Sequence, residues 1–468
     1  MGTIVLYPSP AMGHLVSMVE LGKFTLNHYP GFAITVLVVN PPYNTGSTAS
    51  YINHTSTTTP SITFHHLPSQ PLDLGSYSSM EAINFELLRL SNHHVQQALE
   101  SIASTTVISA FIIDFFCTPA LSIAINLNIP TYHFYTSGAY SLSLFLYLPT
   151  LHQSTSKSYK DLDELLDVPG LPPIPPSDMP VPLLERTSIE YAFFLDVAMQ
   201  FGRSSGILVN TFESLEQKAL KLLSDGIYIP DGPTPPVFSI GPLTASDSAG
   251  EAGSVHECLK WLDAQPSQSV AFLCFGSLGL FSAEQLKEIA IGLERSEQRF
   301  LWVVRSPPSE DKSNRFQSPP APNLDLLLPH GFLDQTKDRG FVVSSWAPQV
   351  DILNHGSVGG FVTHCGWNSV LEAVSAGVPM VAWPLYAEQK LNRLLLVEEM
   401  KLALPIDETE GGLVKAAEIE KRVRELMDSE GGNKIRERAQ AKKEEAKQAM
   451  ADGGSSRVAL AKLVESWK

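Results

Sequence analysis

Two groups of residues in this chain have the types and spacing that a chemical reaction needs. The first group pairs His14, in the segment Pro8-Ser-Pro-Ala-Met-Gly-His14, with Asp114, which closes the apolar run Phe111-Ile-Ile-Asp114. On its own, His14 would be an ordinary residue at the start of a helix. A carboxylate among apolar side chains, however, needs a polar partner. An aspartate that accepts a hydrogen bond from an imidazole fixes the tautomer of the ring, so the pair has the composition of a general base.

The second group lies between Trp346 and Gln389. In it, the apolar run Gly359–Thr363 is followed by His364-Cys-Gly-Trp-Asn-Ser369, where a helical pattern begins. The start of a helix exposes N–H groups and the positive end of the helix dipole, which together bind phosphate. Three polar side chains add donors at the same turn: His364, Asn368 and Ser369. Capping of the helix would also explain either of the last two.

Flat and polar side chains surround this predicted helix start. Trp346 offers an indole face to a nucleobase, and Gln349 and Glu372 can bind ribose hydroxyls. Glu388 and Gln389 follow the next apolar run and supply an acceptor and an amide for sugar hydroxyls. A buried core tryptophan would explain Trp346 alone, but not this collection of polar groups at one sheet edge. The segment therefore predicts a nucleotide-sugar site.

Short, continuously apolar runs alternate with amphipathic helical patterns such as Leu15–Leu26, Met80–Leu99, Ala283–Leu293 and Trp367–Ala376. This alternation predicts an α/β fold with parallel sheets that are covered on both faces. The first half has the predicted strands Ile4–Tyr7, Ile34–Val39, Val107–Ile113, Thr131–Tyr135, Gly206–Asn210 and Val237–Ile240. The second half has Val270–Phe275, Phe300–Val304, Gly340–Val343, Gly359–Thr363 and Pro379–Ala382.

The alternation restarts after a stretch rich in Gly, Ser, Ala and Pro, so we expect two domains. We expect residues 1–240 to form an N-terminal domain, 241–254 a linker, and 255–468 a C-terminal domain that carries the nucleotide-sugar segment. The last helix, about residues 453–468, is expected to pack back on the first domain. Two such sheets bind ligands in the cleft between the carboxyl ends of their strands.

Composition narrows the partners. The chain has 468 residues and a formal net charge of −16, which disfavours nucleic acid and anionic membranes. Its four cysteines include no Cys-x-x-Cys pair, and the N-terminus lacks a basic signal region, so we expect free thiols and a cytoplasmic location. The pattern Asp161-Leu-Asp163 has metal-binding spacing but lies in a polar, lysine-flanked stretch, so no metal is expected. We expect a monomer without membrane insertion.

The segment from Trp346 to Gln389 resembles the signature box of plant UDP-dependent glycosyltransferases, the family 1 enzymes of secondary metabolism, which have the GT-B fold. The likeness extends to the Pro-x-x-Gly-His start, Gly206-Ile-Leu-Val-Asn-Thr-Phe-Glu, Trp261-Leu-Asp and Phe275-Gly-Ser. A match this long and free of gaps is far more specific than a lone glycine motif. Glu388 departs from the family, which more often has aspartate there.

The resemblance implies a role for each matching position. Trp346 stacks on uracil, Ala347 contacts it through the backbone, and Gln349 and Glu372 hold ribose. The diphosphate is held by residues at the helix start and by one further serine: His364, Asn368, Ser369 and Ser277. The sugar contacts are Trp367, Glu388, Gln389 and, from the first domain, Thr136. Glutamine at the last signature position is common in glucosyltransferases, so Gln389 suggests UDP-glucose as the co-substrate, with no further cofactor.

His14 and Asp114 match the family's catalytic pair, which predicts an inverting hexosyltransferase with His14 as the base. Aromatic candidates for the acceptor pocket suggest a flat phenol such as a flavonoid or chalcone: Met12, Phe85, Phe115, Phe116, Tyr140, Phe194 and Phe201. Any one of these residues is also a plausible core residue. Two other classes of protein agree less well with these residues. A phosphate or nucleotide-sugar sensor needs no base, and a dinucleotide oxidoreductase needs a Gly-x-Gly-x-x-Gly after its first strand, which is absent.

Overall fold

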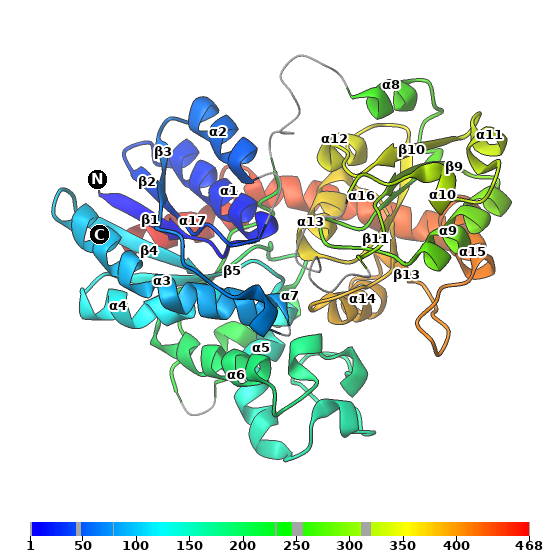
Figure 1. Cartoon of the computed structure of the whole chain (residues 1–468). Helices are drawn as coiled ribbons and strands as arrows, with labels where there is room; N and C mark the ends of the chain where they lie inside the picture. Colours follow the sequence, from blue (N-terminus) through cyan, green and yellow to red (C-terminus); the bar gives the residue numbers. More distant parts are fainter. Residues whose placement is uncertain are drawn as a thin grey trace. The chain divides into compact units, whose positions relative to one another are not determined.

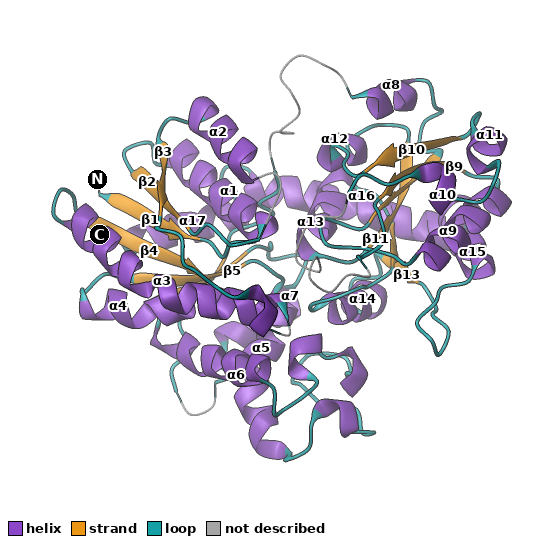
Figure 2. Ribbon diagram, in the orientation of Figure 1, coloured by secondary structure: helices purple, strands orange, loops and turns teal. Residues whose placement is uncertain are grey.

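The computed structural model describes residues 2–43, 48–77, 79–229, 232–245, 256–309 and 320–467. The chain divides into two compact units: unit 1 comprises Met1–Ser246 and Gln448–Lys468, and unit 2 comprises Asp247–Lys447. Each unit contains one parallel sheet with helices around it (Figure 1). Both units therefore contain helices as well as strands (Figure 2). The predicted α/β class with two parallel sheets is confirmed.

Unit 1 contains a seven-stranded sheet in the order β3-β2-β1-β4-β5-β6-β7, in which every neighbouring pair is parallel. The strands are β1 (Thr3–Tyr7), β2 (Ala33–Val38), β3 (Ile62–His66), β4 (Ile108–Asp114), β5 (Thr131–Tyr135), β6 (Gly206–Val209) and β7 (Val237–Ser239). The helices are α1 (Met12–His28), α2 (Thr48–Thr58), α3 (Met80–Ala103), α4 (Leu121–Asn126), α5 (Ala139–Ser154), α6 (Ile189–Gln200), α7 (Gln217–Ser224) and α17 (Ser455–Glu465). Short 3-10 helices lie at Leu74–Ser76, Phe115–Ala120, Tyr159–Asp161, Pro176–Asp178, Val181–Leu183 and Phe201–Arg203.

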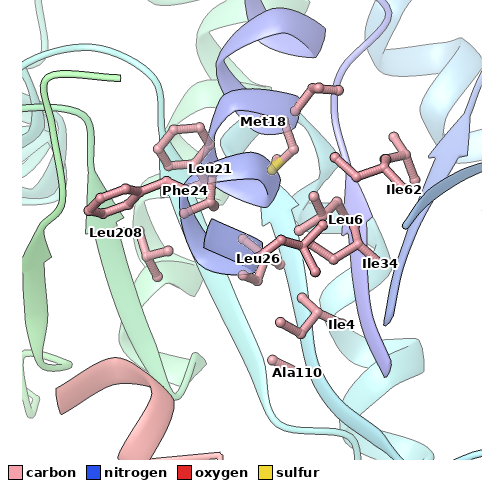
Figure 3. Packing of buried hydrophobic residues seen from close by; sticks show 14 of the residues in the cluster. Ile4, Leu6, Met18, Leu21, Phe24, Leu26, Ile34, Ile62, Ala110 and Leu208 are labelled. Atoms are coloured by element: carbon pink, nitrogen blue, oxygen red, sulfur yellow. The ribbon is translucent and has the colours of Figure 1, made fainter. Parts of the chain in front are cut away.

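The central strand β1 shows why this sheet is covered on both faces. Successive side chains of a strand point to opposite faces. Ile4 and Leu6 pack with Met18 and Leu21 of α1 in one buried cluster (Figure 3). Val5 and Tyr7 belong to a second cluster, which includes residues of α3 and α4. Because both faces are buried, the strand is continuously apolar, as the sequence indicates. Each large aliphatic side chain buried in this way stabilises the fold by about 1.5–3 kcal/mol.

Unit 2 contains a six-stranded sheet in the order β10-β9-β8-β11-β12-β13, again parallel throughout. The strands are β8 (Val270–Cys274), β9 (Arg299–Val304), β10 (Gly340–Ser344), β11 (Val358–Thr363), β12 (Met380–Ala382) and β13 (Ala403–Pro405). The helices are α8 (Glu257–Asp263), α9 (Ala283–Ser296), α10 (Leu324–Leu327), α11 (Phe332–Thr336), α12 (Gln349–Leu353), α13 (Trp367–Ala376), α14 (Gln389–Glu398) and α15 (Ala416–Asp428). Helix α16 (Glu430–Met450) follows them and leads in sequence into the part of the chain that belongs to unit 1.

Both strand orders contain a topological switch point. In unit 1 the chain builds β2 and β3 on one side of β1 and then returns to add β4 on the other side. In unit 2 the same reversal occurs between β8 and β11. Open α/β sheets bind ligands beyond the carboxyl ends of the two strands that flank such a reversal. The topology therefore marks the segments after β1 and β4, and those after β8 and β11, as the places to look for a site.

The two units do not correspond to two consecutive halves of the chain, because unit 1 contains residues from both ends. Of the predicted linker, residues 246–254 lie outside the part that the structure describes. Leu243 belongs to a buried cluster of unit 1, and its backbone N–H donates to Asn210 Oδ1 at 2.8 Å. Helix α17 also belongs to unit 1, where Ser456 Oγ donates to the carbonyl oxygen of Gly241 at 2.5 Å. Within the described residues, no helix combines the length and the apolar character that crossing a membrane requires.

Candidate active site

His14 and Asp114 meet at the switch point of unit 1. His14 lies in the first turn of α1, directly after β1, and Asp114 is the last residue of the neighbouring strand β4. The two strands pair side by side, so the ends of both lie at one edge of the sheet. His14 Nδ1 lies 2.6 Å from Asp114 Oδ2. The Asp114 side chain is fully buried, whereas 23% of the His14 side chain is exposed.

The contacts of Asp114 define the state of the histidine ring. Its other carboxylate oxygen, Oδ1, accepts a hydrogen bond from the backbone N–H of Phe116 at 3.0 Å. An ionised carboxylate can only accept a hydrogen bond, so the histidine tautomer that fits this contact carries its hydrogen on Nδ1. Thr136 Oγ1 lies 3.2 Å from the same Nδ1. The structure thus brings together three predicted residues, His14, Asp114 and Thr136, around one nitrogen of the imidazole.

Aromatic rings adjoin His14. The ring centre of Phe116 lies 5.6 Å from that of His14, and the centre of Phe115 lies 6.1 Å from it. Phe116 in turn packs against Phe85 of α3 at 5.6 Å and Phe194 of α6 at 5.7 Å. Phe85, Phe115, Phe116 and Phe194, four of the residues predicted for the acceptor pocket, thus form a continuous aromatic group next to His14.

Phe201, Tyr140 and Met12 are the remaining acceptor candidates. Phe201 is fully buried and stacks on His133 with ring centres 4.2 Å apart, so its ring packs in the interior. Tyr140 is also buried, in the first turn of α5, and Met12 packs against the cluster formed with α1. Phe193 was not singled out from the sequence, yet it stacks on Phe85 at 3.4 Å. Phe193 and Phe194 are adjacent in the sequence, so the sequence alone does not indicate which of the two rings packs against Phe85.

In unit 2, His364 occupies a slot between two glycines at the switch point. It follows β11, and Gly366 is the N-cap of α13. A Cβ atom on Gly276, in the loop after β8, would lie 2.6 Å from His364 Nε2, and one on Gly366 would lie 2.5 Å from it. Gly276 also has φ of +71°, which favours glycine. A side chain at either position would therefore collide with the buried imidazole of His364.

His364 is uncharged at neutral pH. Burial lowers the pKa of this histidine to about 4. Its Nδ1 is buried and has no hydrogen-bond partner among the described residues. A neutral imidazole has one N–H to donate. Together with the first-turn N–H groups of α13, it makes a donor-rich, uncharged turn that is suited to an anion.

Helices α12 and α13 are joined by a polar network. Gln349 Nε2 donates to Ser369 Oγ at 2.8 Å and to Glu372 Oε2 at 2.6 Å. Burial of the carboxyl group raises the pKa of Glu372 to about 7, and the hydrogen bond from Gln349 opposes that rise. Three of the residues predicted to hold ribose and phosphate are thus in direct contact.

Trp346 presents an exposed aromatic face on the same sheet edge. It follows β10, and 52% of the residue is accessible to solvent. Ala347, the next residue, is buried. An indole with so much exposed apolar surface is suited to stacking on a planar ring.

The side chain of Gln389 is hydrogen-bonded to the backbone of the segment that follows β12. Its Oε1 accepts hydrogen bonds from the backbone N–H groups of Leu385 at 2.9 Å and Tyr386 at 3.0 Å. Asn392, one turn later on α14, donates to the carbonyl oxygen of Cys365 at 2.9 Å and to Glu388 Oε1 at 3.4 Å. Asn392 therefore ties Glu388 to the β11–α13 turn. Sequence reasoning missed it, because an asparagine inside a helix carries no signal of its partner.

Two further observations complete the site in unit 2. Arg305, directly after β9, donates through Nη1 to the carbonyl oxygens of Gly276 and Ser277, which fixes the loop after β8. The sequence interpretation missed this arginine as well. Trp367, in the first turn of α13, is buried. Across the described ranges, no group of three or more His, Cys, Asp or Glu side chains is arranged to hold a metal ion.

Comparison with known proteins agrees with this geometry. Residues 235–429 match the family described as "UDP-glucoronosyl and UDP-glucosyl transferase". The chain is 53% identical over 464 residues to UDP-glycosyltransferase 88B1 of Stevia rebaudiana, covering 99% of this chain and 98% of that one. It is 49% identical over 480 residues to an anthocyanidin 5,3-O-glucosyltransferase of a Rosa hybrid cultivar, with 99% and 98% covered.

Among solved structures, Phytolacca americana UGT2 complexed with UDP-2fluoro-glucose and pterostilbene superimposes with a TM-score of 0.89. The two sequences are 38% identical, and 100% of each chain is covered. Two Rossmann-like units with polar clusters at their switch points define the GT-B class of glycosyltransferases. The chain belongs to the plant UDP-glycosyltransferase family, and it is an enzyme whose donor is a UDP-sugar.

Proposed function

We propose that this enzyme transfers glucose from UDP-glucose to a hydroxyl group of a small phenolic acceptor, with inversion at the anomeric carbon. The observation that carries the proposal is the contact of 2.6 Å between His14 Nδ1 and the fully buried Asp114. The buried carboxylate holds the imidazole through Nδ1, as the aspartate of a catalytic triad does, and we assign Nε2 as the atom that takes the acceptor proton.

The reaction is a single displacement. The acceptor O–H gives its proton to His14 Nε2 as its oxygen bonds to C1 of glucose. The bond between C1 and the β-phosphate oxygen breaks, and its electron pair leaves with UDP. Asp114 stabilises the resulting imidazolium through Nδ1–H, and donors at the start of α13 stabilise the departing diphosphate. No metal ion takes part in this scheme.

The donor assignments follow the resemblance to plant UDP-dependent glycosyltransferases, and contacts among these residues support some of them. Trp346 stacks on uracil, and Ala347 meets it through the backbone. Gln349 and Glu372 hold ribose, a role supported by their mutual hydrogen bond. The diphosphate is assigned to His364, Asn368, Ser369 and Ser277, and glucose to Trp367, Glu388, Gln389 and Thr136. The Gln389 carbonyl is used within its own loop, so its Nε2 hydrogens are the groups assigned to the sugar.

The acceptor class is supported by the aromatic group beside His14 and by two relatives. One relative is named for an anthocyanidin, and another was solved with pterostilbene. Aromatic rings at 5.6–6.1 Å from the base suit a flat aromatic acceptor. Phe85, Phe115, Phe116 and Phe194 are proposed as its contacts, with Phe193 supporting Phe85.

A direct test is to incubate the protein with UDP-glucose and a panel comprising an anthocyanidin, pterostilbene and 3,4-dichloroaniline. Mass spectrometry should detect a hexose added to the phenols, and the proton coupling at C1 should identify the β-glucoside, which reports inversion. Retention of the α configuration would refute the displacement. Transfer to the aniline alone would refute the hydroxyl as acceptor, and loss of activity in EDTA would refute the metal-free scheme.

Glu372 should make donor binding dependent on pH. Because the pKa of its buried carboxyl group is raised to about 7, the group is mostly protonated at pH 6 and mostly ionised at pH 8. The ionised form accepts two ribose hydroxyls, so the affinity for UDP-glucose should fall by roughly 10-fold from pH 8 to pH 6. Calorimetry measures the dissociation constant, and UDP-glucose is used because its diphosphate does not titrate in this range.

The matched variant is Glu372→Gln, which keeps an acceptor for Gln349 but cannot ionise. Its affinity for UDP-glucose should not change between pH 6 and pH 8.

The raised pKa of Glu372 also determines how this group changes the stability of the folded protein with pH. The folded state binds the proton more tightly, so stability from this group is present below about pH 4.5 and is lost as pH rises to 7. Without ligand, Glu372→Gln should therefore unfold at a higher temperature than the wild type at pH 8, and a lower unfolding temperature would contradict this.

A further inference from the structure

A buried carboxylate in unit 1 takes no part in the mechanism described above. Glu216 lies just before α7 and is 1% exposed. Its Oε2 accepts a hydrogen bond from the backbone N–H of Ala139 at 2.8 Å, and its Oε1 accepts one from that of Tyr140 at 3.0 Å. Within the described part of the chain it forms no ion pair. A carboxylate buried this completely is costly unless its hydrogen bonds are specific.

The two N–H groups belong to the first turn of α5. The N-cap of this helix is Gly138, which has no side chain with which to cap it. Glu216 therefore supplies the cap from a segment that follows β6. Burial raises the pKa of Glu216, and the neighbouring Thr211 side chain and the hydrogen bonds from Tyr140 and Ala139 oppose that rise. The positive end of the α5 dipole adds to the stabilisation of the charged form.

The helix start that Glu216 holds is three residues from Thr136. Thr136 follows β5 and is buried, with its Oγ1 3.2 Å from His14 Nδ1. The turn is fixed on the strand side as well, because Tyr135 Oη and Ser141 Oγ are hydrogen-bonded at 2.8 Å. Only Thr136, Ser137 and Gly138 connect β5 to α5. The position of the first turn of α5 thus sets where the Thr136 hydroxyl lies.

We propose that Glu216 is a positioning residue for the reaction: it clamps the start of α5 and thereby holds Thr136 against His14. The inference rests on the proposed function, in which His14 is the base. The Thr136 hydroxyl oxygen is a second acceptor for Nδ1–H, beside Asp114. Displacing it changes the orientation of the imidazole, and small displacements of a catalytic group cost rate steeply.

The variant Glu216→Gln isolates the clamp. Glutamine has nearly the same shape but only one acceptor, so its amide N–H₂ faces one of the two backbone N–H groups. We expect kcat to fall by about 10-fold or more, while the dissociation constant of UDP stays at the wild-type value. The UDP contacts assigned above lie in unit 2, so a fall in UDP affinity would contradict the inference.

A control variant separates positioning from loss of stability. Ser456→Ala removes another buried hydrogen bond of unit 1, the one to the Gly241 carbonyl, without touching the β5–α5 turn. It should lower the unfolding temperature and leave kcat unchanged. The NMR signal of the His14 Nδ1 proton should move in Glu216→Gln and in Thr136→Ala, and should stay in place in Ser456→Ala.

A double-mutant cycle tests whether Glu216 acts on the reaction through Thr136. If Glu216 acts through Thr136, Glu216→Gln should change kcat less than about 2-fold in a Thr136→Ala background. The assay uses UDP-glucose and the panel acceptor that the wild type turns over fastest. An equal loss in both backgrounds, or an unchanged kcat in Glu216→Gln, would overturn the inference.

The kcat of His14→Ala is measured in the same assay. Wild-type kcat in that variant would refute the base itself, a result distinct from loss of coupling between Glu216 and Thr136.

Discussion

Replacing His14 with alanine is expected to lower kcat for a phenolic acceptor by about 10²- to 10⁴-fold, the range that general-base catalysis contributes. The loss is expected because, in the proposed reaction, Asp114 holds Nδ1 at 2.6 Å and Nε2 takes the acceptor proton. Steady-state turnover with UDP-glucose measures the effect. Binding of UDP should not change, since the residues assigned to it lie in unit 2.

His14→Gln is the control for this experiment. Glutamine retains a polar side chain of similar reach but cannot accept a proton at neutral pH. If it restored turnover, His14 would be positioning the acceptor rather than acting as the base. The unfolding temperature should change little in either variant, because part of the His14 side chain is already exposed to solvent.

The second large effect is expected from Asp114→Asn. Asparagine can keep its oxygen on the N–H of Phe116, which now contacts Asp114 Oδ1 at 3.0 Å. Its N–H₂ group then faces His14 Nδ1, which must become the acceptor, and the ring hydrogen moves to Nε2. The base is thereby lost although the shape of the site is preserved. We expect kcat to fall by about 10³- to 10⁴-fold, as when the corresponding aspartate of a catalytic triad is changed in this way.

Comparison with Asp114→Ala tests this explanation. Alanine leaves Nδ1 free to take either tautomer, so the alanine variant should retain more activity than the asparagine variant despite losing more contacts. The opposite order would show that the hydrogen bond matters for packing rather than for the tautomer. Folding is monitored by the unfolding temperature, because removal of a fully buried carboxylate also removes the acceptor for Phe116.

The contact between His14 and Asp114 was predictable from the sequence, whereas the outer strands of the two sheets were not. His14 and Asp114 were paired because each directly follows or ends an apolar run, and the ends of neighbouring parallel strands meet at one edge. Strands β3 and β13 were missed. Ile62 is the one buried residue of the edge strand β3, so the run has no continuous apolar pattern, and β13 has three residues.

Contacts between segments that are remote in sequence were not predictable either. Glu216 caps α5, and Asn392 binds the carbonyl of Cys365, in each case without any local spacing to indicate the partner. Arg305 likewise binds carbonyls in the loop after β8. Such side chains bind backbone groups, whose positions only the folded chain defines. The chemistry of a side chain therefore suggests which residues are candidates to meet the ligand, whereas it gives no sign of the residues that hold those candidates in place.

The central claim, that His14 removes the acceptor proton, is tested most directly by varying the acidity of the acceptor. Turnover by the wild type and by His14→Ala is measured for a series of phenols, from weakly acidic ones to a nitrophenol that is ionised at the assay pH. The account predicts a loss of at least about 10²-fold for the weakly acidic phenols that shrinks toward none for the ionised acceptor, which needs no base. A loss of equal size across the whole series would contradict it.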